Sequence, residues 1–242
     1  GASARGDRAG CAPGSYGCCL VRAARFLGQR KAGGECARPT PAPASASAVS
    51  ILKPLKGTDP EMYESFRSHC LQEYPEYEII FGVSDPADPA AELVERLRVE
   101  FPQRAIRLLV CSENLGSNTK VSNLVQMLRQ AKHENILVND SDIRVPSDYL
   151  RRVMAPLADP QVGLVTCLYR GIASPTLGSR LEALGISTDF SPGVLAGRQL
   201  EGEIRFALGS TLVFSRESLK AAGGLGPLVD YLADDYELGK RI

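Results

Sequence analysis

The chain has 242 residues, with 28 basic and 28 acidic side chains and therefore no formal net charge at neutral pH. This length is enough for one sizeable α/β domain with its own core. Balanced charge gives no overall attraction to nucleic acid, so we expect no nucleic acid partner. No window contains the roughly 18 to 20 apolar residues that cross a bilayer, so we expect no membrane helix within the chain.

Residues 1–48 are expected to be a disordered segment that ends in a linker. They are rich in Ala, Gly and Pro and finish in the run RPTPAPASASA, which cannot bury a core. Their cysteines lack the paired spacing of a zinc or disulfide framework. Cys70, Cys111 and Cys167 stand beside apolar residues and are predicted to be buried free thiols. The folded domain is therefore expected at 49–242.

From Val49 onward, short apolar runs alternate with amphipathic segments. Strands are predicted at 48–55, 77–83, 105–111, 135–140, 162–169 and 207–214, and helices at 60–73, 87–101, 119–131, 146–157, 176–189 and 216–222. This alternation is typical of an α/β fold, a mostly parallel sheet with helices on both faces. Ligands bind such sheets beyond the carboxyl ends of the strands, so polar side chains at those ends are the first candidates for a site.

The run NILVNDSD places Asp140 and Asp142 directly after an apolar strand. Their spacing points both carboxylates toward one side, where they repel each other unless a cation lies between them. Because no Cys or His lies close, Mg²⁺ or Mn²⁺ is favoured over zinc. Phosphate oxygens usually fill the remaining positions around such an ion, which predicts a substrate that carries a diphosphate. An ordinary pair of loop or capping aspartates is the alternative.

Charged residues also follow other strands. Asp85 ends the strand at 77–83, where its carboxylate can accept hydrogen bonds from a base or a ribose. Lys120 lies in the first turn of a helix, where a cation opposes the helix dipole, so contact with a nucleotide phosphate competes with a solvated surface role. Asp234 and Asp235 near the end of the chain either favour the dipole of a helix start or supply a general base to an acceptor hydroxyl.

Six motifs together resemble the ceramide glucosyltransferase-like family, glycosyltransferase family 21. They are SILKPLKG, FGVSDPADPA, GSNTKVSNL, DSDIRVPSDYL, VGLVTCLYRG and LADDYELG, in the family's order. The likeness runs from about Val49 to Ile242 and is greatest to the bacterial branch, which includes hopanoid-associated glycosyltransferases. It implies a Rossmann-like GT-A fold and an inverting transfer of a hexose, glucose or N-acetylglucosamine, from a UDP-sugar. The implied acceptor is the hydroxyl of a membrane lipid that is ceramide-like or a hopanoid.

The resemblance also assigns roles to residues of this chain. It implies Pro54, Asp85, Lys120 and Asp140 as contacts of the UDP-sugar, Asp140 and Asp142 as ligands of Mg²⁺ or Mn²⁺, and Asp235 as the catalytic base. Family members continue into a (Q/R)xxRW segment and membrane helices. The chain is therefore expected to be a catalytic domain truncated at its C-terminal side, membrane-associated and cytoplasmic, with the membrane helices outside it.

The segment 176–196 has two open interpretations. Leu177, Leu181 and Leu184 recur at helical spacing, which most often marks a core face. Pro192 and Gly193 are expected to break this helix before a second apolar run at 194–196. The family resemblance puts this region where the acceptor enters. An apolar surface that meets a lipid at a membrane is therefore the alternative.

Two other functions remain open. A haloacid-dehalogenase-like phosphatase would use Asp140 as nucleophile and Asp142 as general acid. Such enzymes carry this motif on their first strand, whereas three predicted strands precede it here. A truncated domain that binds a nucleotide without turnover is the second alternative.

Overall fold

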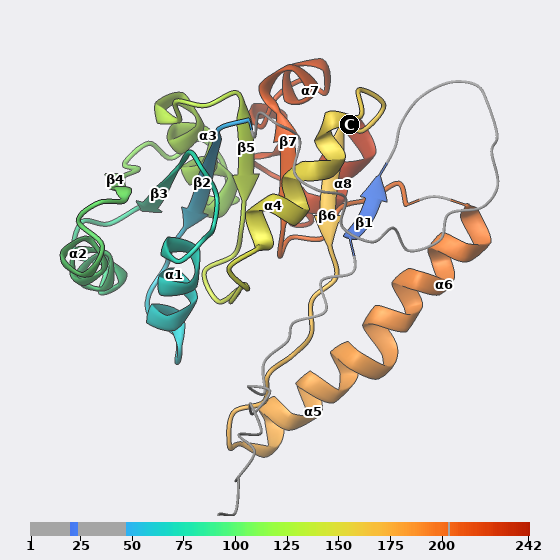
Figure 1. Ribbon diagram of the computed structural model, residues 1–242, viewed down its shortest axis with the longest axis horizontal. Helices are drawn as coiled ribbons and strands as arrows, with labels where there is room; N and C mark the ends of the chain where they lie inside the picture. The colour runs from blue at the N-terminus through green and yellow to red at the C-terminus, as the bar shows by residue number, and fades with distance from the viewer. Residues whose placement is uncertain (1–19, 24–46, 203) are drawn as a thin grey trace, which may run out of the picture.

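The computed structural model describes residues 20–23, 47–202 and 204–242 (Figure 1). In this part of the chain, seven strands form one sheet in the order β1-β6-β7-β5-β2-β3-β4. They are β1 Leu20–Ala23, β2 Val49–Pro54, β3 Tyr77–Val83, β4 Ala105–Val110, β5 Asn135–Val138, β6 Leu164–Cys167 and β7 Leu212–Ser215. The predicted strands from Val49 onward are all present, with ends that differ by a few residues.

The parallel part of the sheet holds the strands that lead to the predicted site. β2 pairs in parallel with β3 and β5, and β3 pairs in parallel with β4. β7 runs antiparallel to both β5 and β6, and β1 runs antiparallel to β6. Five of the seven strands therefore share one direction. β2 lies between β3 and β5. The sheet grows from β2 toward one edge through β3 and β4, and toward the other edge through β5, β7 and β6.

Helices cover both faces of the sheet, as the sequence predicted. On one face, α1, α2 and α4 pack with Ile51, Ile79 and Leu137. On the other face, α3, α7 and α8 pack with Leu52 and Ile80. Neighbouring residues of one strand thus enter different cores, because side chains of a strand alternate between faces. The helices are α1 Met62–Cys70, α2 Ala90–Glu100, α3 Thr119–Gln130, α4 Tyr149–Met154, α7 Arg216–Ala221 and α8 Asp234–Arg241, with the 3₁₀ segments η1 Ala155–Ala158 and η3 Gly226–Leu228.

One described strand lies within residues 1–48. Leu20–Ala23 form β1, which pairs with β6 at the edge of the sheet. The remainder of residues 1–46 lies outside the described residues. Cys70, Cys111 and Cys167 are buried, as predicted. Among the described helices, none combines the length and apolar character that crossing a bilayer would need.

The predicted helix break at Pro192 is wrong. α5 Leu177–Gly185 continues through the π-helical turn η2 Ile186–Phe190 into α6 Ser191–Glu201, and together they form one long rod that is set apart from the sheet (Figure 1). Ser191 N donates to Ile186 O, five residues back, so the hydrogen-bond register changes at this turn. Pro192 lies in the first turn of α6, directly after this change of register, where its missing N–H is tolerated.

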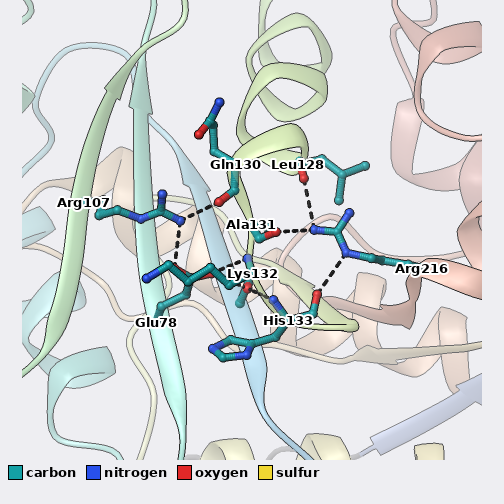
Figure 2. A network of polar contacts seen from close by, with 9 residues as sticks. Glu78, Arg107, Leu128, Gln130, Ala131, Lys132, His133 and Arg216 are labelled. Atoms are coloured by element: carbon teal, nitrogen blue, oxygen red, sulfur yellow. Dashed lines mark hydrogen bonds and ion pairs between the residues drawn. The ribbon is translucent and has the colours of Figure 1, made fainter.

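A polar network secures the end of the sheet opposite the predicted site (Figure 2). The buried carboxylate of Glu78 accepts hydrogen bonds from Arg107 Nη2 at 2.8 Å and from the backbone N of Lys132 at 2.7 Å. Arg216 donates to the carbonyls of Leu128, Ala131 and His133, at and just beyond the end of α3. A cation at a helix C-terminus satisfies the last carbonyls and favours the helix dipole. This network fixes α3, whose other end faces the site.

Candidate active site

A cleft of about 1650 Å³ opens beyond the carboxyl end of β5. Its walls come from the start of α3, the loop after β5, α5, the segment before β7 and the start of α8. The charged residues in its lining include Lys120, Asp140, Asp142, Asp234 and Asp235. In an open α/β sheet this is where ligands bind, because the chain leaves the central strands toward opposite edges there. The cleft exceeds the ~300–1,000 Å³ of a typical single-ligand pocket, which suits two substrates.

The carboxylates of Asp140 and Asp235 face one point in this cleft. That point is the position that a Cβ on Gly209 would occupy, 3.0 Å from Asp235 Oδ2 and 3.5 Å from Asp140 Oδ2. The other oxygen of Asp140, Oδ1, accepts a hydrogen bond from Lys120 Nζ at 2.8 Å. Lys120 thus offsets part of the repulsion between the two negative charges. The arrangement joins residues from the loop after β5 and from α8, which are far apart in the sequence.

The electrostatics of the cleft follow from this crowding of acids. Burial disfavours the ammonium of Lys120, but the carboxylates of Asp140, Asp234 and Asp235 together hold its pKa above the usual value. Partial burial, and then the neighbouring Asp140 carboxylate, raise the pKa of Asp142. Lys120 is therefore a firmly charged cation inside an acidic cleft, able to contact a phosphate group.

The first turn of α8 gives its two aspartates different surroundings. Asp234 is buried, and its Oδ1 accepts a hydrogen bond from Asn118 Nδ2 at 3.2 Å, which ties α8 to the start of α3. Burial raises the pKa of Asp234, against the attraction of Lys120. Asp235 is less buried and faces the point beside Asp140. Asp234 thus anchors the helix, and Asp235 presents its carboxylate to the cleft.

A buried lysine lies directly beneath the acidic loop. Lys53 is fully buried, and its Nζ donates to Asn139 Oδ1 at 2.5 Å and to the carbonyl of Asp140 at 2.7 Å. Burial lowers the pKa of Lys53 to about 7, against the attraction of Asp140 and Asp142. Asn139 Nδ2 in turn donates to Ser210 O at 2.6 Å. This chain of hydrogen bonds ties β2, the acidic loop and the segment before β7 together.

The acidic residues fit one kind of metal site. None of the described residues forms a group of three or more His, Cys, Asp or Glu side chains that could hold a metal alone. Mg²⁺ and Mn²⁺ do not need such a group, because one or two carboxylates hold them together with phosphate oxygens and water. Asp140 and Asp142, which both line the cleft, could hold an ion completed by a diphosphate and leave Asp235 free of it. The ligands are all oxygens, which does not favour zinc.

The structure brings some of the predicted site residues together and leaves others apart. Lys120, Asp140, Asp142 and Asp235 all line the cleft. Pro54 ends β2 and Asp85 follows β3, and neither belongs to the residues that line it. Asp85 is exposed, and its Oδ1 accepts a hydrogen bond from Ala87 N at 2.8 Å, as in a local turn. Their contact with a nucleotide stays a prediction.

Sequence reasoning missed two parts of the cleft. The first is Gly209, which reads as an ordinary residue at the start of a strand. The second is an apolar rim made by exposed side chains that line the cleft: Tyr169 (36% exposed), Ile172 (60%), Tyr231 (43%) and Leu232 (97%). The rim comes from two loops distant in the sequence, and no local pattern links them.

The family model "Glycosyl transferase family 21" matches residues 16–242. The chain belongs to this family. The matched residues include β1. Family membership excludes the phosphatase alternative.

Curated relatives of the family 21 chain include ceramide glucosyltransferases. Ceramide glucosyltransferase 3 of Caenorhabditis elegans is 29% identical over 199 residues, which are 82% of this chain and 43% of the relative. Ceramide glucosyltransferase of Komagataella phaffii is 34% identical over 116 residues, which are 46% of this chain and 23% of the relative. The chain therefore spans less than half the length of these relatives.

Solved structures establish the GT-A fold of the family 21 chain. A mannosyltransferase from Pyrobaculum calidifontis, in complex with GDP-Man and Mn²⁺, aligns with a TM-score of 0.61 and 25% identity over 82% of this chain and 52% of its own. GalNAc-T7 with UDP, GalNAc and Mn²⁺ aligns with a TM-score of 0.57 at 12% identity, over 82% of this chain and 41% of its own. The predicted fold class is confirmed.

Proposed function

We propose that the protein transfers a hexose, glucose or N-acetylglucosamine, from a UDP-sugar to the hydroxyl of a membrane lipid with inversion at the anomeric carbon. The observation that carries this proposal is the pair of carboxylates, Asp140 and Asp235, that face one point in the cleft. Metal-dependent, inverting transfer from a nucleotide sugar needs an ion site for the diphosphate beside a base for the acceptor. The family membership and the GT-A fold support the same assignment.

On the donor side, Asp140 and Asp142 would hold Mg²⁺ or Mn²⁺ against the diphosphate. The ion neutralises charge on the diphosphate leaving group when it is bound. Lys120, already in contact with Asp140, supplies a second positive charge from the first turn of α3. Lys53 and Asn139 keep the acidic loop in place from below. These residues would bind and orient the donor rather than react with it.

On the acceptor side, Asp235 would take the proton from the attacking hydroxyl. Its carboxylate is the less buried of the two on α8 and faces the cleft beside Asp140. A hydroxyl bound next to Asp235 therefore lies close to a donor held by Asp140. Deprotonation of the hydroxyl as it attacks the anomeric carbon is a general-base step and favours inversion at that carbon.

Apolar side chains around the cleft support a lipid acceptor. Ile172 and Leu232 on the cleft rim are exposed to 60% and 97%. On α5, which forms one wall, the outer leucines Leu177, Leu181 and Leu184 are exposed to 73%, 58% and 57%. An exposed apolar surface beside an acidic cleft suits a lipid presented at a membrane surface. The structure thus favours the surface interpretation of these leucines, because they do not pack in a core.

Donor binding tests the metal-dependent half of the proposal. In the full natural chain, Asp140→Asn should weaken the binding of UDP-glucose or UDP-N-acetylglucosamine in the presence of Mn²⁺. The expected loss is at least the ~10- to 100-fold seen when residues that support metal ligands are removed. Isothermal titration calorimetry measures it, and EDTA should have a comparable effect on the unmodified protein.

The matched control is Asp148→Asn, the same chemical change on a residue that does not line the cleft. This variant should bind the donor as the unmodified protein does. UDP-sugar affinity that is unchanged in Asp140→Asn, or insensitive to EDTA, would contradict the proposed donor site.

A further inference from the structure

Gly209 stands where the two carboxylates of the cleft converge. A Cβ built on it would lie 3.0 Å from Asp235 Oδ2 and 3.5 Å from Asp140 Oδ2. The first distance is too short for comfortable contact, so an alanine would displace the Asp235 carboxylate by a few tenths of an ångström. The missing side chain therefore leaves the space that separates Asp235 from Asp140.

The backbone around Gly209 is held in place and cannot yield to a new side chain. Leu208 N donates to Thr166 Oγ1 at 2.9 Å, and the same hydroxyl donates back to Leu208 O at 3.1 Å. Ser210 O accepts from Asn139 Nδ2 at 2.6 Å, and Ser210 Oγ donates to Cys167 O at 3.1 Å. An added methyl group would therefore displace the Asp235 side chain, whose Oδ2 is the nearest atom.

Backbone conformation does not require a glycine at this position. The positive φ values of glycines in the described residues belong to Gly57, Gly202, Gly223 and Gly224, and Gly209 is not among them. An alanine can adopt the backbone angles of Gly209 without strain. The need for glycine here comes from the space above it and not from the fold of the segment.

We propose that Gly209 is a positioning residue for sugar transfer, because its lack of a side chain keeps the Asp235 carboxylate at the distance from the Asp140 site that the acceptor hydroxyl needs. This inference rests on the proposed function and adds a residue to it. Gly209 acts through Asp235, so its replacement should affect the transfer step and leave donor binding in place. Small displacements of a reacting group are costly, since a shift of ~1 Å can lower a rate ~100-fold.

The test is Gly209→Ala in the full natural chain, with kcat and donor affinity measured separately. We expect kcat for transfer to a lipid acceptor to fall ~10-fold or more, with the Kd for the UDP-sugar within ~2-fold of the unmodified protein. Gly226→Ala is the control, because a Cβ there meets no atom within 4 Å. Its kcat and Kd should both stay unchanged.

A double variant distinguishes an effect of Gly209 through Asp235 from a general loss of structure. In an Asp235→Asn background the base is already disabled, so adding Gly209→Ala should cost less than ~3-fold more in kcat. Unchanged turnover in Gly209→Ala, an equal loss of donor affinity and turnover, or a full additive loss in the double variant would each overturn the inference. Absence of transfer by the unmodified protein would instead contradict the proposed function.

Discussion

At the scale of single residues, Glu78 shows how this fold accommodates a buried charge. Its side chain is 2% exposed, and burial alone would raise its pKa. Hydrogen bonds from Ser50 Oγ at 2.6 Å, from Lys132 N at 2.7 Å and from Arg107 Nη2 at 2.8 Å reverse that effect and lower the pKa. Removing one member of a buried, hydrogen-bonded charge network leaves its partners unsatisfied and destabilises the fold. We therefore expect the Glu78 carboxylate to contribute to the free energy of unfolding at neutral pH.

Glu78→Gln should lower the free energy of unfolding at pH 7 by about 1–3 kcal/mol, since a charge-assisted hydrogen bond is lost. The folded pKa of Glu78 lies below the unfolded value of ~4.3, so its contribution is present above that value and is lost as the pH falls through the folded pKa. The difference between the two proteins should therefore shrink below pH ~4.

Urea unfolding at both pH values measures this difference. Glu95→Gln, which removes a surface ion pair with Arg98, is the matched control and should show a smaller loss. A Glu78 variant as stable as the unmodified protein at pH 7 would mean that the network in Figure 2 does not stabilise the fold.

The sequence predicts only part of the site at this scale. Asp140, Asp142 and Lys120 follow strands, and that local signal was enough to place them at one edge of the sheet. The sequence does not reveal that Asn139 bonds to Lys53, because the two side chains meet through tertiary packing between β2 and β5. Gly209 carries no chemical group of its own, so its role emerges only from the carboxylates around it.

At the scale of elements, the rod formed by α5, η2 and α6 has a cleft side and an outer side. Ala183, Ile186 and Phe190 line the cleft. Leu177, Leu181 and Leu184 lie on the outer side, and each is more than half exposed. The π-helical turn adds one residue to the register between the two helices, a feature that often occurs at functional sites. The outer side is the proposed contact with the membrane.

Leu181→Asp should weaken the binding of the protein to liposomes. Burying one leucine side chain is worth about 1.5–3 kcal/mol, so the partition coefficient should fall ~10-fold or more. Sedimentation with liposomes measures it, and UDP-sugar affinity should stay unchanged because the leucine points away from the cleft. Val99→Asp is the control, since Val99 is 81% exposed on α2, which lies well apart from α5 (Figure 1). Equal sedimentation of both variants would remove α5 from the membrane contact.

The sequence predicts those helices and strands whose pattern of apolar residues lies within the element itself. A buried strand such as β3 is predicted from its short apolar run, and an amphipathic helix such as α3 from its helical periodicity. The leucines of α5 have the same spacing as a core face, and spacing alone does not say what lies against them. Pro192 predicts a helix end because a proline removes one backbone donor, whereas the register change at η2 makes that loss tolerable. β1 depends on pairing with β6, which its own four residues do not encode.

At the scale of the whole molecule, the two ends of the sheet have different roles. The end with Glu78, Arg107 and Arg216 is held by hydrogen bonds and anchors α3. The opposite end carries the cleft, where the proposed donor site at Asp140 meets the proposed base, Asp235. The apolar rim lines that cleft, and α5 forms one of its walls. In the proposed function, one molecule would bring a water-soluble donor and a lipid acceptor to this cleft.

The most direct test of this account is the transfer of radiolabelled hexose from a UDP-sugar to a lipid acceptor by the full natural chain, compared between the unmodified protein and Asp235→Asn with Mn²⁺ present. We expect a labelled glycolipid from the unmodified protein. In the variant, kcat should fall ~10²- to 10⁴-fold while donor affinity stays near normal, because a general base contributes mainly in the transition state. Equal turnover by both proteins, or donor binding without transfer by the unmodified protein, would contradict the account.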